Sequence, residues 1–219
     1  MRITLPSGTS AEVQTVPGAT RGLVVIPDIF GLRPLFDDHV ARFATEWRMT
    51  TIAVDPFPGL PADIDIDGRF AAVSKLRDTD KFRDLREAAS TTGCTSVGLI
   101  GFCMGGMYCF KAASMNLFDR IASFYGMITL PEAWHGEGQG EPLDHLATGD
   151  PSRVLAVIGG KDTWTPPADV DKLRGTGVTV AFYGEADHGF AHDTARPAHR
   201  VDDAADAFSR AREWLSASA

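Results

Sequence analysis

Ile-Gly-Phe-Cys-Met-Gly-Gly, at residues 100–106, is the stretch that decides the fold. It follows an apolar run at 96–100 that predicts a buried strand, and it leads into a segment, 104–115, that predicts a helix. A nucleophile at such a turn is held in a strained conformation, and small residues flank it because neighbouring backbone crowds those positions. The N-terminus of the helix also favours thiolate over thiol. The pattern predicts a reactive Cys103; the alternative is a buried structural cysteine in a tight turn.

Strand and helix patterns alternate on both sides of this turn. Further apolar runs that predict buried strands lie at 22–27, 51–54, 121–125, 153–158 and 178–182. Segments with helical spacing or helix-opening prolines lie at 36–48, 69–90 (with a break near 78–80), 166–174 and 200–215. This alternation predicts an α/β fold with a mainly parallel, twisted sheet and helices on both faces. Ligands of such sheets bind at the carboxyl ends of the strands, which is where we expect the functional residues.

Three segments need separate expectations. Residues 1–20 are polar and rich in turn residues, which predicts short edge strands. Residues 131–151 fit neither a strand nor a helix, and we expect a long loop there, either a lid or a surface excursion. The last helix is expected to turn Val201 and Ala205 inward together with its other apolar residues. We expect residues 1–219 to form a single domain.

Composition narrows the class of protein. The chain has 219 residues, of which 44% are hydrophobic and 23% charged, and its formal net charge is −8. An acidic chain is a poor partner for nucleic acid or an anionic membrane, so we expect neither and look to a small molecule instead. The apolar runs are too short to cross a bilayer, and the first residues lack a secretory signal pattern. Three cysteines favour a reducing compartment, so we expect a cytoplasmic protein.

A reactive thiol needs a base, and the base needs an orienting acid. In the α/β-hydrolase arrangement the chain order is nucleophile, acid, histidine. Cys103 is followed by Asp162, which comes directly after the predicted strand at 153–158. His188 comes after the last predicted strand, at 178–182. The sequence therefore predicts that these three side chains meet at one edge of the sheet.

Other roles stay open for the acids in these loops. Asp162 could be a helix N-cap, and Glu185 or Asp187 could take its place beside His188. His188 and His192 are four residues apart, a spacing at which two histidines on a helix can bind a metal ion. The loop composition argues against a helix here, and no nearby residues complete a set of metal ligands. No phosphate-binding glycine motif is present either. We therefore expect neither a metal nor another cofactor.

With these residues in place, the chain resembles the dienelactone hydrolase family, cysteine enzymes of the α/β-hydrolase fold that open enol-lactone rings. The segments that carry the resemblance are 25–31, 55–57, 101–106, 124–126, 160–162 and 188–190. The resemblance implies an α/β-hydrolase fold and a catalytic triad of Cys103, Asp162 and His188. It also implies an oxyanion hole built from the backbone N–H groups of Ile29 and Met104.

Two positions depart from the family pattern. Asp28 stands where the family has a glutamate that contacts the nucleophile, so it is expected either to support the thiol or to act as a turn acid. His192 stands where the well-known lactonases have an arginine that grips the substrate carboxylate, and a histidine cannot form a bidentate ion pair. The expected substrate contacts are His192 itself, Arg69 as another anchor, and Phe30 and Tyr125.

The expected activity is hydrolysis of an ester or lactone through a thioester acyl-enzyme. Two alternatives stay open on the same fold: a non-catalytic binder of a small ligand, and a thioesterase or acyl transferase. The intact order of the three candidate catalytic residues favours an enzyme over a binder. The natural substrate stays open, and we expect a monomer or a small homo-oligomer.

Overall fold

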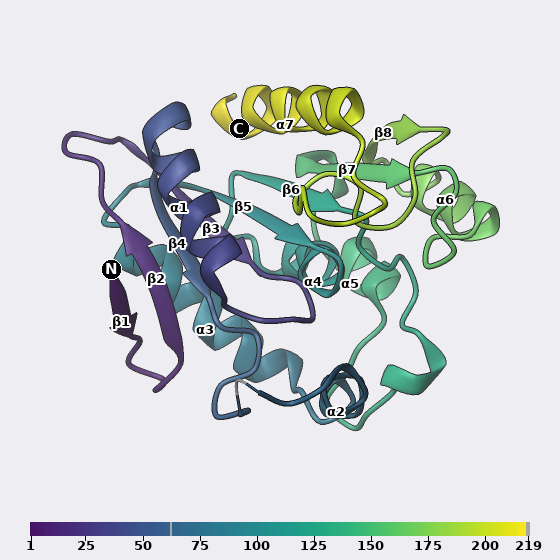
Figure 1. Ribbon diagram of the computed structural model, residues 1–219, viewed down its shortest axis with the longest axis horizontal. Helices are drawn as coiled ribbons and strands as arrows, with labels where there is room; N and C mark the ends of the chain where they lie inside the picture. Colours follow the sequence, from purple (N-terminus) through teal and green to yellow (C-terminus); the bar gives the residue numbers. More distant parts are fainter. Residues whose placement is uncertain (62, 218–219) are drawn as a thin grey trace.

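The computed structural model describes residues 1–61 and 63–217. Within them, one sheet has the strand order β1-β2-β4-β3-β5-β6-β7-β8 (Figure 1). The strands are β1 (Arg2–Thr4), β2 (Ser10–Gln14), β3 (Arg21–Ile26), β4 (Thr50–Val54), β5 (Ser96–Phe102), β6 (Arg120–Phe124), β7 (Val154–Gly159) and β8 (Thr179–Tyr183). β2 pairs antiparallel with β1 and β4, whereas every pairing from β4 to β8 is parallel. The predicted fold class is confirmed, including the short strands near the N-terminus.

Helices cover both faces of this sheet. They are α1 (Pro34–Trp47), α2 (Ile66–Val73), α3 (Asp78–Thr91), α4 (Met104–Ala112), α5 (Pro142–Thr148), α6 (Pro167–Arg174) and α7 (Val201–Ser216). α1 and α7 lie together on one face, and α3 and α4 pack against β3 to β5 on the other (Figure 1). This is the arrangement that right-handed crossovers between parallel strands produce.

The central strands are mainly apolar because both of their faces are covered. Leu23, Val24 and Leu99 have no exposed surface, and β4 and β7 are buried at every position. α1 buries Phe36, Val40 and other apolar residues at intervals of three and four, which is the spacing that defines one helix face. Burial of this kind is the main stabilising contribution to the fold.

Three expectations need correction. Residues 69–90 form two helices, and the break falls at 74–77, slightly before the predicted position. Residues 131–151 are less irregular than expected, because they contain α5 and a short 3-10 helix at Glu132–Trp134. In α7 the inward residues are Ala204, Ala207, Ala211 and Leu215. Val201 is 72% exposed and Ala205 is exposed as well, so the buried stripe is rotated from the one we expected.

In the part of the chain that the structure describes, no helix combines the length and the apolar composition that a membrane crossing requires.

Candidate active site

The turn between β5 and α4 has the strained geometry that its sequence predicts. Cys103 sits at the N-terminal end of α4 with φ 58° and ψ −118°, a conformation that side-chain-bearing residues rarely adopt. A Cβ atom on Gly101 would lie 2.2 Å from the carbonyl oxygen of Gly105, and one on Gly105 would lie 2.2 Å from that of Ile26. The backbone N–H of Cys103 donates to the Phe124 carbonyl at 3.0 Å. The glycines are therefore required by close backbone approach, and the turn is fixed to the neighbouring strand.

An imidazole and a carboxylate meet close to this turn. The Nδ1 atom of His188 lies 2.9 Å from Oδ2 of Asp162, and the Asp162 side chain has no exposed surface. The other carboxylate oxygen, Oδ1, accepts a hydrogen bond from the backbone N–H of Trp164 at 2.8 Å. Because an ionised carboxylate only accepts, Nδ1 of His188 carries its proton toward Asp162. This leaves Nε2 of the ring for another partner.

The two alternative acids have other partners. Glu185 is exposed and pairs with Lys161 at 2.6 Å. Asp187 accepts the backbone N–H of His188 at 2.6 Å instead of approaching its ring. Of the three acids considered from the sequence, Asp162 is therefore the one whose carboxylate orients the imidazole.

Cys103 is the second partner of His188. Burial alone lowers the pKa of His188, but the interaction with Cys103 and the hydrogen bond that the imidazole donates to Asp162 outweigh it. The net effect raises the pKa of His188 from 6.5 to about 10. At neutral pH this arrangement favours the imidazolium form of His188.

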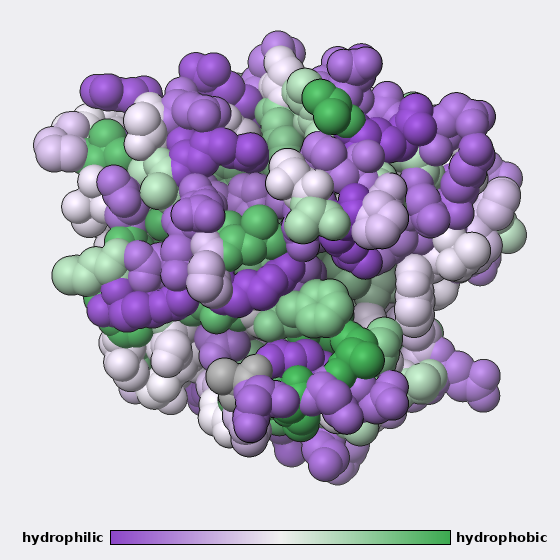
Figure 2. Space-filling view, viewed as in Figure 1, coloured by the Kyte–Doolittle hydropathy of each residue, from purple (hydrophilic) through white to green (hydrophobic). Residues whose placement is uncertain are grey.

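These groups open into a cavity of about 180 Å³. Cys103 and His188 line it together with an aromatic wall of Phe70, Trp134 and Trp164. The Trp164 ring is 6.1 Å from that of Phe70 and 5.8 Å from that of Trp134. Figure 2 shows hydrophobic side chains gathered over and beside α2, on a face that is otherwise mainly hydrophilic. The cavity is small and mostly apolar, as sites for small ligands are.

The two predicted oxyanion-hole residues flank the thiol. Ile29 follows β3 and lines the cavity, and Met104 is the first residue of α4. Among the residues that the structure describes, neither backbone N–H donates to a protein acceptor. Both donors are therefore available for an oxygen atom of a bound molecule.

Asp28 lies in the same cavity wall, but its carboxylate is already engaged. Arg33 donates to both of its oxygens, at 2.5 and 3.0 Å, and His192 Nε2 lies 2.8 Å from Oδ2. Oδ1 also accepts the backbone N–H of Phe30 at 3.0 Å. Burial raises the pKa of Asp28, but its interactions with His192 and Arg33 outweigh burial and lower the pKa from 3.8 to about 2. The turn role expected from the sequence is therefore present, and the carboxylate stays ionised.

His192 and Tyr125, two predicted substrate contacts, lie behind the cavity wall. His192 is 2% exposed; its Nε2 faces Asp28, and its Nδ1 lies 2.5 Å from the Tyr125 hydroxyl. Burial lowers the pKa of His192. Tyr125 is fully buried and its ring packs 5.3 Å from that of His188. Neither side chain lines the described cavity, so the expectation that they touch substrate is not supported. Phe30, by contrast, lines it and is 40% exposed.

The two arginines nearest the site differ in position. Arg69 is 9% exposed and lines a neighbouring hollow that includes Asp55, not the cavity that contains Cys103. Arg196, which the sequence analysis did not single out, does line that cavity, and its guanidinium lies against Gly189. The only signal for Arg196 is its place in the loop that begins at His188.

Comparison with known proteins identifies the family of this chain. The model of the dienelactone hydrolase family matches residues 60–219. The chain belongs to the dienelactone hydrolase family. The resemblance drawn from the sequence is thereby confirmed.

Relatives and solved structures extend the comparison over the rest of the chain. Carboxymethylenebutenolidase 2 of Cupriavidus pinatubonensis is 26% identical over 190 residues, covering 82% of this chain and 78% of that protein. The carboxymethylenebutenolidase of Rhodococcus opacus is 23% identical over 217 residues, covering 90% and 81%. The crystal structure of the "Putative Dienelactone Hydrolase" of Klebsiella pneumoniae has a TM-score of 0.87 at 25% identity and covers 99% of this chain and 97% of its own. An esterase of Pyrococcus furiosus, with a TM-score of 0.71 at 15% identity over 98% and 89%, shares the fold.

Proposed function

We propose that this dienelactone hydrolase family member hydrolyses an ester or lactone through a thioester on Cys103. Membership of the family and the similarity to carboxymethylenebutenolidases support ester or lactone hydrolysis. The observation that carries the finer proposal is that Cys103 stands at a strained turn and lines one cavity with His188, whose Nδ1 is held by Asp162.

The first half of the reaction forms the acyl-enzyme. The thiolate of Cys103 attacks the carbonyl carbon, and the carbonyl oxygen becomes an oxyanion held by the N–H groups of Ile29 and Met104. A single donor of this kind typically lowers the barrier by about 3 kcal/mol. The C–O bond to the leaving group then breaks, and His188 gives its Nε2 proton to the departing alkoxide or enolate. In a lactone the leaving oxygen stays attached to the acyl group.

The second half releases the product. Neutral His188 accepts a proton from water, which attacks the thioester carbonyl and passes through a second oxyanion in the same hole. Collapse of this intermediate expels the thiolate of Cys103 and yields a carboxylic acid. Asp162 keeps the imidazole in one orientation and stabilises its charged form in both halves. A thiolate suits a good leaving group such as an enolate better than an amine, so the site favours esters and lactones over peptides.

The cavity restricts the substrate. A volume of about 180 Å³ admits a small ring or short acyl group, and the wall of Phe70, Trp134 and Trp164 favours an apolar or unsaturated one. Arg196 adds one positive charge to the wall. We propose that Arg196 binds an acidic group of the substrate, in place of the arginine that the family carries at the position of His192.

Asp28 is proposed to fix the oxyanion hole and not to touch the thiol. Its carboxylate holds the N–H of Phe30, the residue that follows Ile29, and is itself held by Arg33 and His192. These bonds anchor the backbone on the C-terminal side of the Ile29 N–H donor. A donor that is already in place costs no reorganisation when the oxyanion forms.

The segment 131–151 is proposed to be a fixed wall of the cavity and not a moving lid. Gln139 accepts a hydrogen bond from the fully buried Lys111 at 2.7 Å and donates to the Val73 carbonyl at 2.8 Å. Asp78 holds Lys111 at 2.9 Å and also accepts the N–H of Gly140 at 2.7 Å. These contacts secure the segment at Gln139 and Gly140, shortly after Trp134, which lines the cavity.

The experiment that tests the proposed function is a panel of neutral and carboxylated γ-lactones and aryl esters, assayed with the wild type and with Cys103→Ala. We expect turnover of at least one class by the wild type and none by the variant. Turnover that survives in Cys103→Ala would contradict the cysteine mechanism. A wild type that binds members of the panel without hydrolysing them would favour the non-catalytic alternative.

A further inference from the structure

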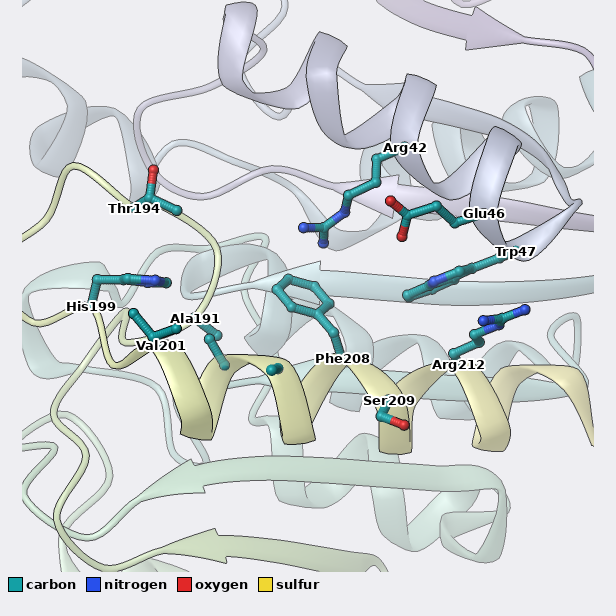
Figure 3. Close-up of a pocket in the computed structure, with 12 residues that line it drawn as sticks. Arg42, Glu46, Trp47, Ala191, Thr194, His199, Val201, Phe208, Ser209 and Arg212 are labelled. Carbon is teal, nitrogen blue, oxygen red and sulfur yellow. The ribbon is translucent and has the colours of Figure 1, made fainter.

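A second cavity lies between α1 and α7, with a volume of about 410 Å³ (Figure 3). Arg42 reaches it from α1, Phe208 from α7, and His199 from the loop that leads into α7. Among the described residues, none lines both this cavity and the one that contains Cys103. Its size falls within the usual range of small-molecule sites, about 300–1,000 Å³.

Arg42 has hydrogen-bond donors with nothing to donate to. Its Nε and Nη2 atoms are buried, and neither has a partner in the described part of the chain. The guanidinium carbon lies 4.3 Å from the centre of the Phe208 ring and 5.1 Å from that of Phe43, so aromatic faces hold it in place. Buried donors in proteins are nearly always paired. Because Nε and Nη2 are also closed to solvent, an acceptor from outside the chain would bind the guanidinium through Nη1, which is not among these buried atoms.

His199 lines the same cavity and also has an unpaired nitrogen. The Nδ1 atom of His199 is buried and has no partner among the described residues. The charged residues of the lining are Arg42, Arg212 and Glu46, which leave one net positive charge. The chain as a whole has a formal charge of −8, so this wall differs in sign from the protein around it. A ligand with a single negative charge would complete it.

The rest of the lining contains the polar residues Thr194 and Ser209 and a group of apolar side chains. Trp47 and Phe208 present aromatic rings, and Val201, which is 72% exposed, stands at the start of α7. An apolar body on the ligand would cover these side chains. The combination favours an organic monoanion over a doubly charged inorganic one.

We propose that the cavity between α1 and α7 binds a small organic carboxylate, with its oxygens on Arg42 and its apolar part against Trp47 and Phe208. Inorganic phosphate shares the oxyanion chemistry but has no apolar part. Benzoate, phosphate and neutral benzamide therefore separate the contributions of charge and shape.

The four tryptophans of the chain report which cavity is occupied. Trp47 lines the proposed site, Trp134 and Trp164 line the cavity with Cys103, and Trp214 lines neither. The indole N–H signals in a ¹H–¹⁵N spectrum of the full chain can be assigned with single Trp→Phe variants. Titration with benzoate is expected to move the Trp47 signal in a saturable way, whereas benzamide and phosphate at the same concentrations are not.

Arg42→Gln removes the charge of Arg42 but keeps much of its size, and should weaken benzoate binding at Trp47 by at least about tenfold. Arg83→Gln is the matched control: Arg83 is exposed on α3, far from this lining, and its replacement should leave the affinity unchanged. If Arg42→Gln does not fold, the proposal is tested by the difference between the Trp47 signal shifts that benzoate and benzamide cause in the wild type. A Trp47 signal unmoved by benzoate, equal responses to benzoate and benzamide, or full affinity in a folded Arg42→Gln protein would overturn the proposal.

Discussion

Two of the imidazole–carboxylate pairs in the molecule have opposite electrostatics. His188 faces Asp162 at 2.9 Å, and His192 faces Asp28 at 2.8 Å. The pKa of His188 is raised to about 10, whereas burial lowers the pKa of His192. A carboxylate at hydrogen-bond distance therefore does not decide the charge of a histidine.

The third partner explains the difference. His188 also faces the charge of Cys103, which adds to that of Asp162. The carboxylate of Asp28 is instead shared with Arg33, whose positive charge opposes protonation of His192. The imidazole of His188 therefore keeps its proton more readily than that of His192, which fixes a loop. The comparison indicates that the group beyond the carboxylate helps to set the charge of each imidazole.

Removal of the thiol should have the largest effect. Cys103→Ala is expected to lower kcat for an activated aryl ester by at least about 10⁴-fold, because it deletes the nucleophile and the charge on which His188 depends. Steady-state kinetics and thermal denaturation measure activity and folding in the same preparation. Cys94→Ala is the matched control, because Cys94 is partly exposed and lines neither described cavity; it should keep full activity.

The next largest effect should come from the orienting acid. Asp162→Asn is expected to lower kcat by about 10³-fold with little change in KM, because the amide no longer holds the charged imidazole in its orientation. Asp187→Asn replaces a carboxylate that contacts only the backbone N–H of His188 and should stay within about threefold of the wild type. Similar losses of kcat in Asp162→Asn and Asp187→Asn would contradict the assignment of Asp162 as the acid that orients His188.

Thiol reactivity tests the His188 pair directly. A raised histidine pKa means that the imidazolium, and its stabilisation of the folded ion pair, are fully present below pH 6.5 and lost as the pH rises through about 10. Alkylation of Cys103 by iodoacetamide should therefore stay fast at pH 6. His188→Ala should slow it there by about 100-fold, because an ordinary thiol is scarcely ionised at that pH. An alkylation rate that falls steeply between pH 8 and pH 6 in the wild type would contradict the ion pair.

Asp28 should affect stability more than chemistry. Asp28→Asn is expected to cost about 2 kcal/mol of unfolding free energy, because Arg33 and His192 lose a buried charged partner. The pKa of Asp28 is lowered from 3.8 to about 2, so its contribution is present above pH 3.8 and is lost as the pH falls through 2. Urea unfolding at pH 7 and pH 3 checks this, and the gap between wild type and variant should narrow at the lower pH. A gap that widens in acid would reverse the assigned sign.

Arg196 should give the smallest effect, confined to charged substrates. Arg196→Gln is expected to raise KM about tenfold for an ester that carries a carboxylate and to leave KM for a neutral ester unchanged. Arg69→Gln changes an arginine outside the cavity and is expected to leave both values unaltered. Equal effects of Arg196→Gln on both esters would assign it a structural role.

The sequence was sufficient for the parts of the molecule where local pattern and chain order dominate. The strained turn at Cys103 requires glycine on both sides, and that requirement is visible as a motif. Asp162 and His188 follow apolar strands, so their place at the edge of the sheet could be predicted.

The features that could not be predicted from the sequence depend on the paths of loops that bring distant residues together. Arg196 reaches the cavity through a turn in which its N–H bonds to Asp193, and no spacing rule indicates that path. The engagement of Asp28 by Arg33 and His192 joins the loop after β3 to a loop more than 160 residues later. Val201 was misplaced because the hydrophobic pattern does not reveal that the start of α7 borders an open cavity.

The central claim is that an acyl group passes through the Cys103 sulfur. Mixing the enzyme with an aryl ester of a slowly hydrolysed acid, quenching in acid, and mapping peptides by mass spectrometry measures this directly. We expect the peptide that contains Cys103 to carry the added mass of the acyl group. The acylated peptide should form and decay at rates that match turnover. Turnover with that peptide unmodified, or with the acyl group on another residue, would contradict it.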